Sequence, residues 1–114
     1  MVSPYIPTRG DLIWLEFDPQ AGHEQGGRRP ALVLSAYGYN AKTKRCLVCP
    51  ITSKVKGYPF EVLLPENLPI QGVVLADHLK NLGWFARRAV YIAHANENLI
   101  RQTIALIDAL MSDN

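Results

Sequence analysis

The sequence has no long hydrophobic run. Its longest apolar stretches, residues 31–34 and 89–93, stop far short of the ~20 residues that a membrane-spanning helix needs. Its first residues include two prolines and lack the charged and then apolar layout of a secretory signal. These absences predict a cytoplasmic protein that does not span a membrane.

Cysteine is scarce as well. The only two, Cys46 and Cys49, form a CxxC pair, which could be a redox pair or half of a zinc site. Residues 47–52 are typical of a strand, where side chains three positions apart point to opposite faces, and no second Cys or Cys/His pair completes four zinc ligands. We therefore expect two structural thiols, with no metal and no other cofactor.

The chain also has little net charge. Twelve Lys and Arg residues against ten Asp and Glu residues leave +2, which is too small to identify an anionic partner. A length of 114 residues with 48% hydrophobic residues is enough for one core. We expect a single domain over residues 1–114, in which the positions of the charges are more informative than their sum.

Short apolar runs separated by Gly, Pro, Asn and Lys clusters predict six strands. These are residues 11–17, 30–35, 47–52, 59–64, 72–76 and 86–92. We find no helical pattern between them, which indicates an antiparallel barrel or sandwich and not alternating βαβ units. Residues 20–28 contain three glycines and almost nothing apolar, so they are predicted to be an exposed loop.

One helix is predicted at the end of the chain. Asn96 can cap it, and Glu97 favours the positive N-terminal end of the helix dipole. Its apolar residues repeat at three- and four-residue steps, namely Leu99, Ile100, Thr103, Ile104, Leu106, Ile107, Leu110 and Met111. The sequence therefore predicts a mainly β fold, a small antiparallel barrel with one C-terminal α-helix.

Polar and reactive side chains gather in four segments next to predicted strand ends. They are His23, Glu24, Gln25, Arg28 and Arg29; Thr52, Ser53, Lys54 and Lys56; Asp77, His78 and Lys80; and Trp84, Arg87 and Arg88. Metal-free RNA cleavage needs a base for the 2′-hydroxyl, an acid for the leaving 5′-oxygen and donors for the phosphorus centre. Glu24, Asp77 or His23 could be the base. Arg29 or His23 could serve the other roles.

Arginine is a poor proton donor at neutral pH, but its planar fork suits bidentate contact with a phosphate. We assign Arg29 to electrostatic stabilisation, and Thr52 to hydrogen-bond donation to the same charge. Each also has a purely structural explanation, because Arg29 could pair with a carboxylate and Thr52 could end its strand with a local hydrogen bond.

Aromatic residues accompany the positive charges, and RNA bases stack on such rings. The four are Trp14, Tyr58, Phe60 and Trp84. Trp14 and Phe60 could equally serve the core, whereas Tyr58, between Gly57 and Pro59, is the better exposed candidate. The two remaining histidines, at positions 78 and 94, have no ligand-like spacing and are assigned to the surface or to packing.

Three stretches of the chain resemble the MazF/PemK family of type II toxin endoribonucleases, which includes Kid and ChpB-like members. Residues 10–35 (GDLIWLEFDPQAGHEQGGRRPALVLS) resemble the family's first strand, loop motif and second strand. Residues 39–62 carry its PxTS element and KGYPFEV segment, and residues 72–84 (GVVLADHLKNLGW) continue the match. The resemblance covers nearly the whole chain and is strongest to the MazF branch.

This resemblance implies an SH3-like (CcdB/PemK-like) barrel that forms a homodimer. It implies sequence-specific, ribosome-independent and metal-free cleavage of single-stranded mRNA, which leaves a 2′,3′-cyclic phosphate and a 5′-hydroxyl and inhibits translation and growth. It also implies a cognate MazE-like antitoxin whose disordered acidic C-terminal segment blocks the RNA groove.

The resemblance also implies site residues. The family's catalytic positions fall on Arg29, Thr52, Glu24, Asp77 and His23, and the residues expected to bind RNA are Gln25, Arg28, Ser53, Lys54, Lys56, Tyr58, Lys80 and Arg87. The PemK/Kid branch has an arginine two positions before its aspartate, where Leu75 stands here. This difference leaves Arg29 as the better cation, and the base stays open among Glu24, Asp77 and His23.

Two other classes remain as alternatives. A CcdB-like toxin of the same fold would bind and poison DNA gyrase without cutting RNA, and fold alone does not separate the two. An SH3-like adaptor would hold proline-rich peptides in an aromatic groove. Neither needs the set Glu24, Arg29 and Thr52.

Overall fold

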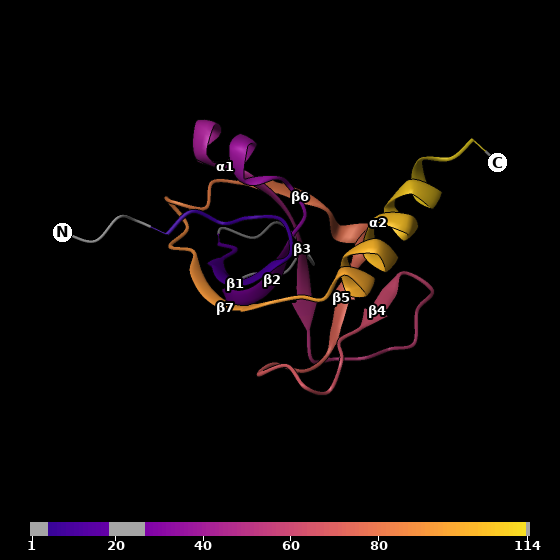
Figure 1. Cartoon of the computed structure of the whole chain (residues 1–114). Coiled ribbons are helices and arrows are strands. Elements are labelled where there is room, and N and C mark those ends of the chain that lie inside the picture. The colour runs from indigo at the N-terminus through magenta and orange to yellow at the C-terminus, as the bar shows by residue number, and fades with distance from the viewer. Residues whose placement is uncertain (1–4, 19–26, 114) are drawn as a thin grey trace.

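The computed structural model describes residues 5–18 and 27–113 (Figure 1). The elements follow one another as β1 (Asp11–Glu16), β2 (Arg28–Val33), α1 (Tyr37–Thr43), β3 (Cys46–Thr52), β4 (Glu61–Leu63), β5 (Val73–Leu75), the 3₁₀ turn η1 (Ala76–His78), β6 (Lys80–Leu82), β7 (Val90–His94) and α2 (Glu97–Met111). No described helix combines the length and apolar character needed to cross a membrane.

The strands form an antiparallel sheet along the path β4-β5-β3-β2-β1-β7, and β6 pairs with another part of β3. The registers place Leu12 opposite Leu32 and Thr52 opposite Val73. Among the described strands the path ends at β4 and β7, which do not pair with each other, so hydrogen bonds do not close the sheet into a ring. The predicted mainly β, antiparallel fold with a C-terminal helix is confirmed, whereas closure into a barrel is not.

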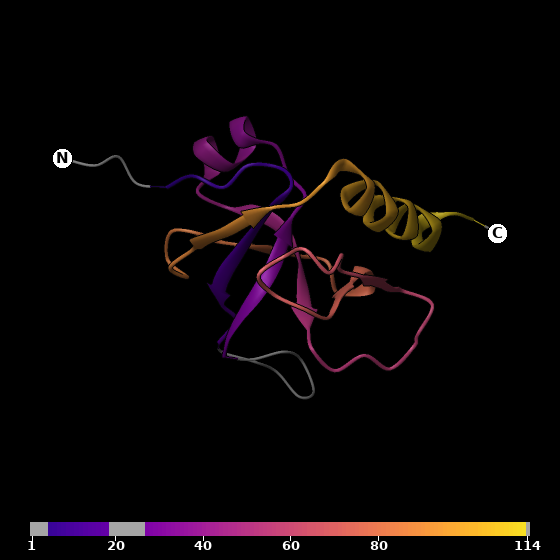
Figure 2. The ribbon, with the colours of Figure 1, turned by 60° about the horizontal axis from the view of Figure 1, so that its bottom comes forward.

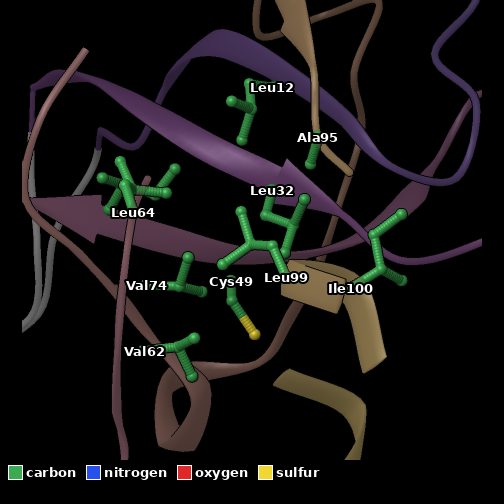
Figure 3. Close-up of a cluster of buried hydrophobic side chains, with 10 residues drawn as sticks. Leu12, Leu32, Cys49, Val62, Leu64, Val74, Ala95, Leu99 and Ile100 are labelled. Carbon is green, nitrogen blue, oxygen red and sulfur yellow. The ribbon is translucent and has the colours of Figure 1, made fainter. Parts of the chain in front are cut away.

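Two hydrophobic clusters lie on opposite faces of the central strands. Alternate residues of β1 enter different clusters, with Leu12 in the one shown in Figure 3 and Ile13 in the other. Burying each such side chain, relative to leaving it exposed, contributes about 1.5–3 kcal/mol to the free energy of folding. The strands of the sheet's centre are therefore fixed from both sides, which makes their ends a rigid support for a site.

The two cysteines follow the same alternation. Cys49 belongs to the cluster of Figure 3 and Cys46 to the second one, and both are buried free thiols. Burial raises the pKa of each thiol to about 12, which keeps them protonated and unreactive near neutral pH. The predicted structural role is confirmed.

Helix α2 begins where the sequence predicts. The Asn96 side chain accepts a hydrogen bond from the backbone N–H of Leu99 at 2.8 Å, satisfying one of the otherwise unpaired first-turn donors. Leu99 and Ile100 enter the cluster of Figure 3, and the helix packs against β4 and η1. The first turns of the predicted apolar stripe thus join the core, whereas Leu110 and Met111 in the last turn are exposed.

The predicted absence of a helix between the strands is wrong. Helix α1 lies between β2 and β3, where the sequence has no apolar stripe and contains Gly38. Hydrogen bonds of its buried Asn40 stabilise this helix in place of an apolar stripe. The Asn40 side-chain amide donates to the carbonyls of Pro7 and Ser35 at 2.8 and 3.0 Å. The helix ends at Lys44 in the left-handed conformation, at φ 57°.

The last two strands also differ from the prediction. The short strand β6 was not predicted, because only three residues pair with β3. The segment expected to form a strand from residue 86 first makes a turn, in which the Ala89 N–H donates to the carbonyl of Trp84 and Arg88 is left-handed at φ 56°. Strand β7 therefore begins only at Val90.

Candidate functional site

The ends of β2, β3 and β5 surround a pocket of about 230 Å³. Its described lining consists of Arg29, Thr52, Lys54, Lys56, Tyr58, Phe60, Glu61, Leu75, Asp77 and His78. These residues come from β2, the end of β3, the segment that leads from β3 to β4, the first residue of β4, the last residue of β5, and η1. Figure 2 shows the segment between β3 and β4 looping outward from the lower end of β3 before it returns to β4.

Six of the predicted site residues meet in this pocket. They are Arg29, Thr52, Lys54, Lys56, Tyr58 and Asp77. The predicted residues His23, Glu24 and Gln25 lie outside the described part of the chain. The sequence therefore identified the segments that form the pocket, although it could not place their side chains.

Four further predicted residues do not line the pocket. The Arg28 guanidinium donates to the carbonyl of Arg88 at 3.4 Å, and the Arg87 guanidinium donates to the carbonyls of Glu16 and Asp18 at 3.1 and 3.0 Å. Ser53 and Lys80 are also absent from the lining. Arg87 in particular links the turn before β7 to the end of β1.

Thr52 ends β3 and is only 8% exposed. Its hydroxyl oxygen accepts a hydrogen bond from the backbone N–H of Lys54 at 3.1 Å. On the other side, a β-carbon at Gly72 would lie 2.1 Å from the Thr52 carbonyl oxygen, and Gly72 has a φ of +126°. Only glycine combines this backbone conformation with such a close approach. The strand end that presents Thr52 is therefore held tightly between two segments.

Glu61 holds the lysine-bearing segment in place. Its carboxylate accepts hydrogen bonds from the backbone N–H groups of Lys56 and Gly57, at 3.2 and 2.9 Å. The Lys56 ammonium lies 5.8 Å from the centre of the Tyr58 ring, a cation–π distance. Glu61 was not among the predicted site residues, because its role depends on how the chain turns back before β4.

The pocket combines positive charge with ionisable proton carriers. Arg29, Lys54 and Lys56 supply cations that suit a phosphate, of which the two lysines are exposed and Arg29 is half-buried. The His78 Nε2 and the Asp77 Oδ1 lie 3.7 Å apart. The described residues contain no cluster of three His, Cys, Asp or Glu side chains that could hold a metal ion. The arrangement can therefore hold an anion and exchange protons with it through these two side chains.

Leu75 forms an apolar wall of the pocket and lies opposite Glu61 in the β4–β5 register. It is 8% exposed. The position at which the PemK/Kid branch has a cation is therefore occupied here by a hydrocarbon side chain that packs against the sheet. The pocket's positive charge comes instead from Arg29 and the two lysines.

The two histidines have different surroundings. His78 lies at the surface, as assigned, with a side chain that is 39% exposed, but it also lines the pocket. His94 does lie at the surface, where its Nδ1 is 2.9 Å from the Asp11 carboxylate. No spacing rule separates the two, since a three-residue turn after β5 decides where His78 points.

The remaining predicted aromatics divide between pocket and core. Phe60 lines the pocket beside Tyr58. Trp84 is buried in the second hydrophobic cluster, and its indole N–H donates to the carbonyl of Asn40 at 2.9 Å. Trp14 is half-buried on β1. Among the described aromatics of the predicted set, Tyr58 and Phe60 are thus the two that can meet a ligand in this pocket.

Fold and pocket together define a small antiparallel β protein with a cationic, aromatic site, a combination suited to single-stranded nucleic acid. Comparison with known families matches residues 8–111 to the PemK-like, MazF-like toxins of type II toxin–antitoxin systems. The chain belongs to this family. The resemblance found in the sequence is thereby confirmed.

Individual relatives agree with this assignment. The chain is 55% identical over 89 residues to the endoribonuclease toxin MazF of Escherichia coli K12, covering 78% of this chain and 79% of the relative. It is 33% identical to the endoribonuclease toxin ChpB of the same organism, over 97% and 99% of the two chains. The crystal structure of MazF from Deinococcus radiodurans superimposes with a TM-score of 0.92 at 52% identity, covering 95% of this chain and 98% of that one.

Proposed function

We propose that this toxin is an endoribonuclease that cleaves single-stranded RNA in the pocket around Arg29 and Thr52, without a metal ion. The observation that carries the proposal is the meeting of Arg29, Thr52 and Asp77 in one pocket with Lys54, Lys56 and Tyr58. Several relatives are named endoribonucleases, which supports RNA cleavage as the reaction.

In the proposed reaction the 2′-oxygen of the RNA attacks the neighbouring phosphorus, and the bond to the 5′-oxygen breaks. Arg29 stabilises the negative charge that builds up on the phosphate, and the Thr52 hydroxyl donates a hydrogen bond to the same group. Asp77 accepts the proton of the 2′-hydroxyl, with Glu24 and His23 as the alternative bases. The products are a 2′,3′-cyclic phosphate and a 5′-hydroxyl.

The segment between β3 and β4 binds the RNA strand in this proposal. Lys54 and Lys56 neutralise phosphates, and Tyr58 offers an exposed ring on which a base stacks, worth about 1–3 kcal/mol per base. Gln25, Arg28, Ser53, Lys80 and Arg87 are proposed to extend this surface beyond the pocket.

The proposal includes the biological setting. The toxin acts in the cytoplasm as a homodimer, cuts mRNA at a short sequence, and is neutralised by a cognate antitoxin with an acidic C-terminal segment. Structures described as MazE–MazF complexes from Deinococcus radiodurans, one of which matches this chain with a TM-score of 0.88 at 50% identity, support such a partner.

Replacement of Glu61 tests how the RNA-binding segment is positioned. We expect Glu61→Ala to raise KM about ten-fold, because the loss of charge-assisted hydrogen bonds worth about 1.5 kcal/mol loosens the segment. Glu61→Gln keeps an acceptor oxygen and removes a negative charge near the phosphates, so its KM should be unchanged or lower. Steady-state cleavage of a fluorogenic RNA measures both. A lower KM in both variants would contradict the positioning role.

The proposed activity is tested by incubating the purified protein with a synthetic single-stranded RNA in excess EDTA. Cleavage at defined positions is expected. In parallel, DNA gyrase supercoiling is assayed with the same protein, because a CcdB-like toxin would inhibit gyrase and leave the RNA intact. That second outcome would overturn the proposal.

A further inference from the structure

The proposed reaction requires a proton for the leaving 5′-oxygen, and the pocket's cations are poor sources of one. Guanidinium, ammonium and phenol groups ordinarily release a proton only at about pH 10 or above. An imidazole exists in both protonation states near neutral pH and is the side chain that most often acts as a general acid. In the described lining of the pocket, the imidazole belongs to His78.

The backbone around His78 is fixed. The N–H of Ala76, the first residue of η1, donates to the carbonyl of Phe60 at 3.0 Å, and Ala76 itself is fully buried. Helix α2 also packs against η1. The turn therefore presents Asp77 and His78 from a rigid base, unlike a group carried on an exposed loop.

The side chain of His78 is accessible while lying next to an acceptor. It is 39% exposed, and its Nε2 lies 3.7 Å from the Asp77 carboxylate. The proposed reaction takes a proton from one oxygen of the phosphorus centre and delivers one to another, and this pocket holds both a carboxylate and an imidazole for these two transfers. The apolar Leu75 leaves the neighbouring wall without a competing proton donor.

Several charged groups surround this pair. Across the pocket, the cations are Arg29, Lys54 and Lys56, and the facing carboxylate is that of Glu61. Helix α2, which packs against η1, carries Glu97, Arg101 and Asp108, all exposed. Groups of both signs therefore lie around the pocket, and the Asp77 carboxylate is the neighbour of His78 at 3.7 Å.

We propose that His78 is the general acid of the reaction. As the bond between the 2′-oxygen and phosphorus forms, Asp77 takes the 2′-hydroxyl proton. As the bond between phosphorus and the 5′-oxygen breaks, the His78 imidazolium gives its proton to that oxygen. The protonated Asp77 and the neutral His78 then return to their starting states by proton exchange with each other or with solvent. This inference rests on the proposed RNA cleavage.

A change of leaving group tests the assignment. After the cleavage site has been mapped, two RNA oligonucleotides are compared, one natural and one with sulfur in place of the 5′-bridging oxygen. A thiolate leaves without protonation, so it does not need a general acid. We expect His78→Gln to cut the natural RNA about 10²–10³-fold more slowly than the wild type and the sulfur substrate within a few-fold of it.

The pH profile provides a second readout. Wild-type kcat/KM should fall on the alkaline side of its pH optimum, because a general acid is active only in its protonated form, and this fall should be absent in His78→Gln. His94→Gln is the matched control, since His94 lies outside the pocket, and it should keep the wild-type profile.

Two results would overturn the proposal. Equal slowing of His78→Gln on both substrates would show a structural contribution, and undiminished cleavage of natural RNA would show no contribution at all. Neither result affects the proposed function itself, which fails only if the wild-type protein cuts neither oligonucleotide.

Discussion

Substitution of Arg29 by alanine should reduce RNA cleavage by at least about 10²–10³-fold, the usual effect of removing one preorganised donor to a developing negative charge. Arg29 lies in β2 opposite Leu15 and lines the pocket beside Thr52. Since its side chain is half-buried at the strand's end and not in either hydrophobic cluster, the variant should stay folded and dimeric. Single-turnover cleavage, circular dichroism and size-exclusion chromatography measure these three properties.

Two controls interpret the Arg29 result. Arg29→Lys keeps the positive charge but loses the planar fork, so its rate should lie between those of the wild type and the alanine variant. Arg28→Ala removes the neighbouring arginine, whose guanidinium contacts the carbonyl of Arg88 outside the pocket, and should change the rate by only a few-fold. Undiminished cutting by Arg29→Ala would refute the assignment.

Substitution of Thr52 by alanine should slow cleavage by about 10²-fold, because it removes a hydrogen-bond donor from the phosphate. The structure adds a second effect. The Thr52 hydroxyl also accepts from the backbone N–H of Lys54, so its loss should cost about 1 kcal/mol of stability and loosen the start of the RNA-binding segment. Rapid-quench kinetics and urea unfolding measure the two effects separately.

Thr52→Ser and Thr52→Val separate the hydroxyl from the methyl group. Serine keeps both hydrogen-bonding functions and should retain most of the activity. Valine preserves the shape at a strand end held between Gly72 and Lys54, yet it should be as slow as alanine. If valine instead cut at the wild-type rate, Thr52 would serve packing alone.

Much of the fold could be predicted from the sequence because its strands alternate between two cores. The opposite directions of Cys46 and Cys49 follow from strand geometry, and the cap at Asn96 follows from local hydrogen bonding. Helix α1 could not be predicted, since a buried Asn40 stabilises it through contacts with distant Pro7. Such contacts leave no periodic pattern in a sequence.

The sequence predicted which segments of the chain form the site, but not how their individual side chains are placed in it. Arg29 and Thr52 were identified because the resemblance maps family positions onto them, and both line the pocket. Glu61 was missed, and His78 was named among the reactive side chains but not assigned to the site, because their placement depends on the β4–β5 register and on the short turn after β5. That Leu75 forms an apolar wall of the pocket could not be predicted either, because it depends on which face of β5 the side chain occupies.

The most direct test of metal-free transesterification in this pocket is analysis of the RNA ends produced in excess EDTA. Mass spectrometry of the fragments, with Arg29→Ala as the control, identifies the chemistry at each end. We predict 2′,3′-cyclic phosphates and 5′-hydroxyls from the wild type and intact RNA from the variant. A requirement for added Mg²⁺, or 5′-phosphate and 3′-hydroxyl ends, would contradict the account.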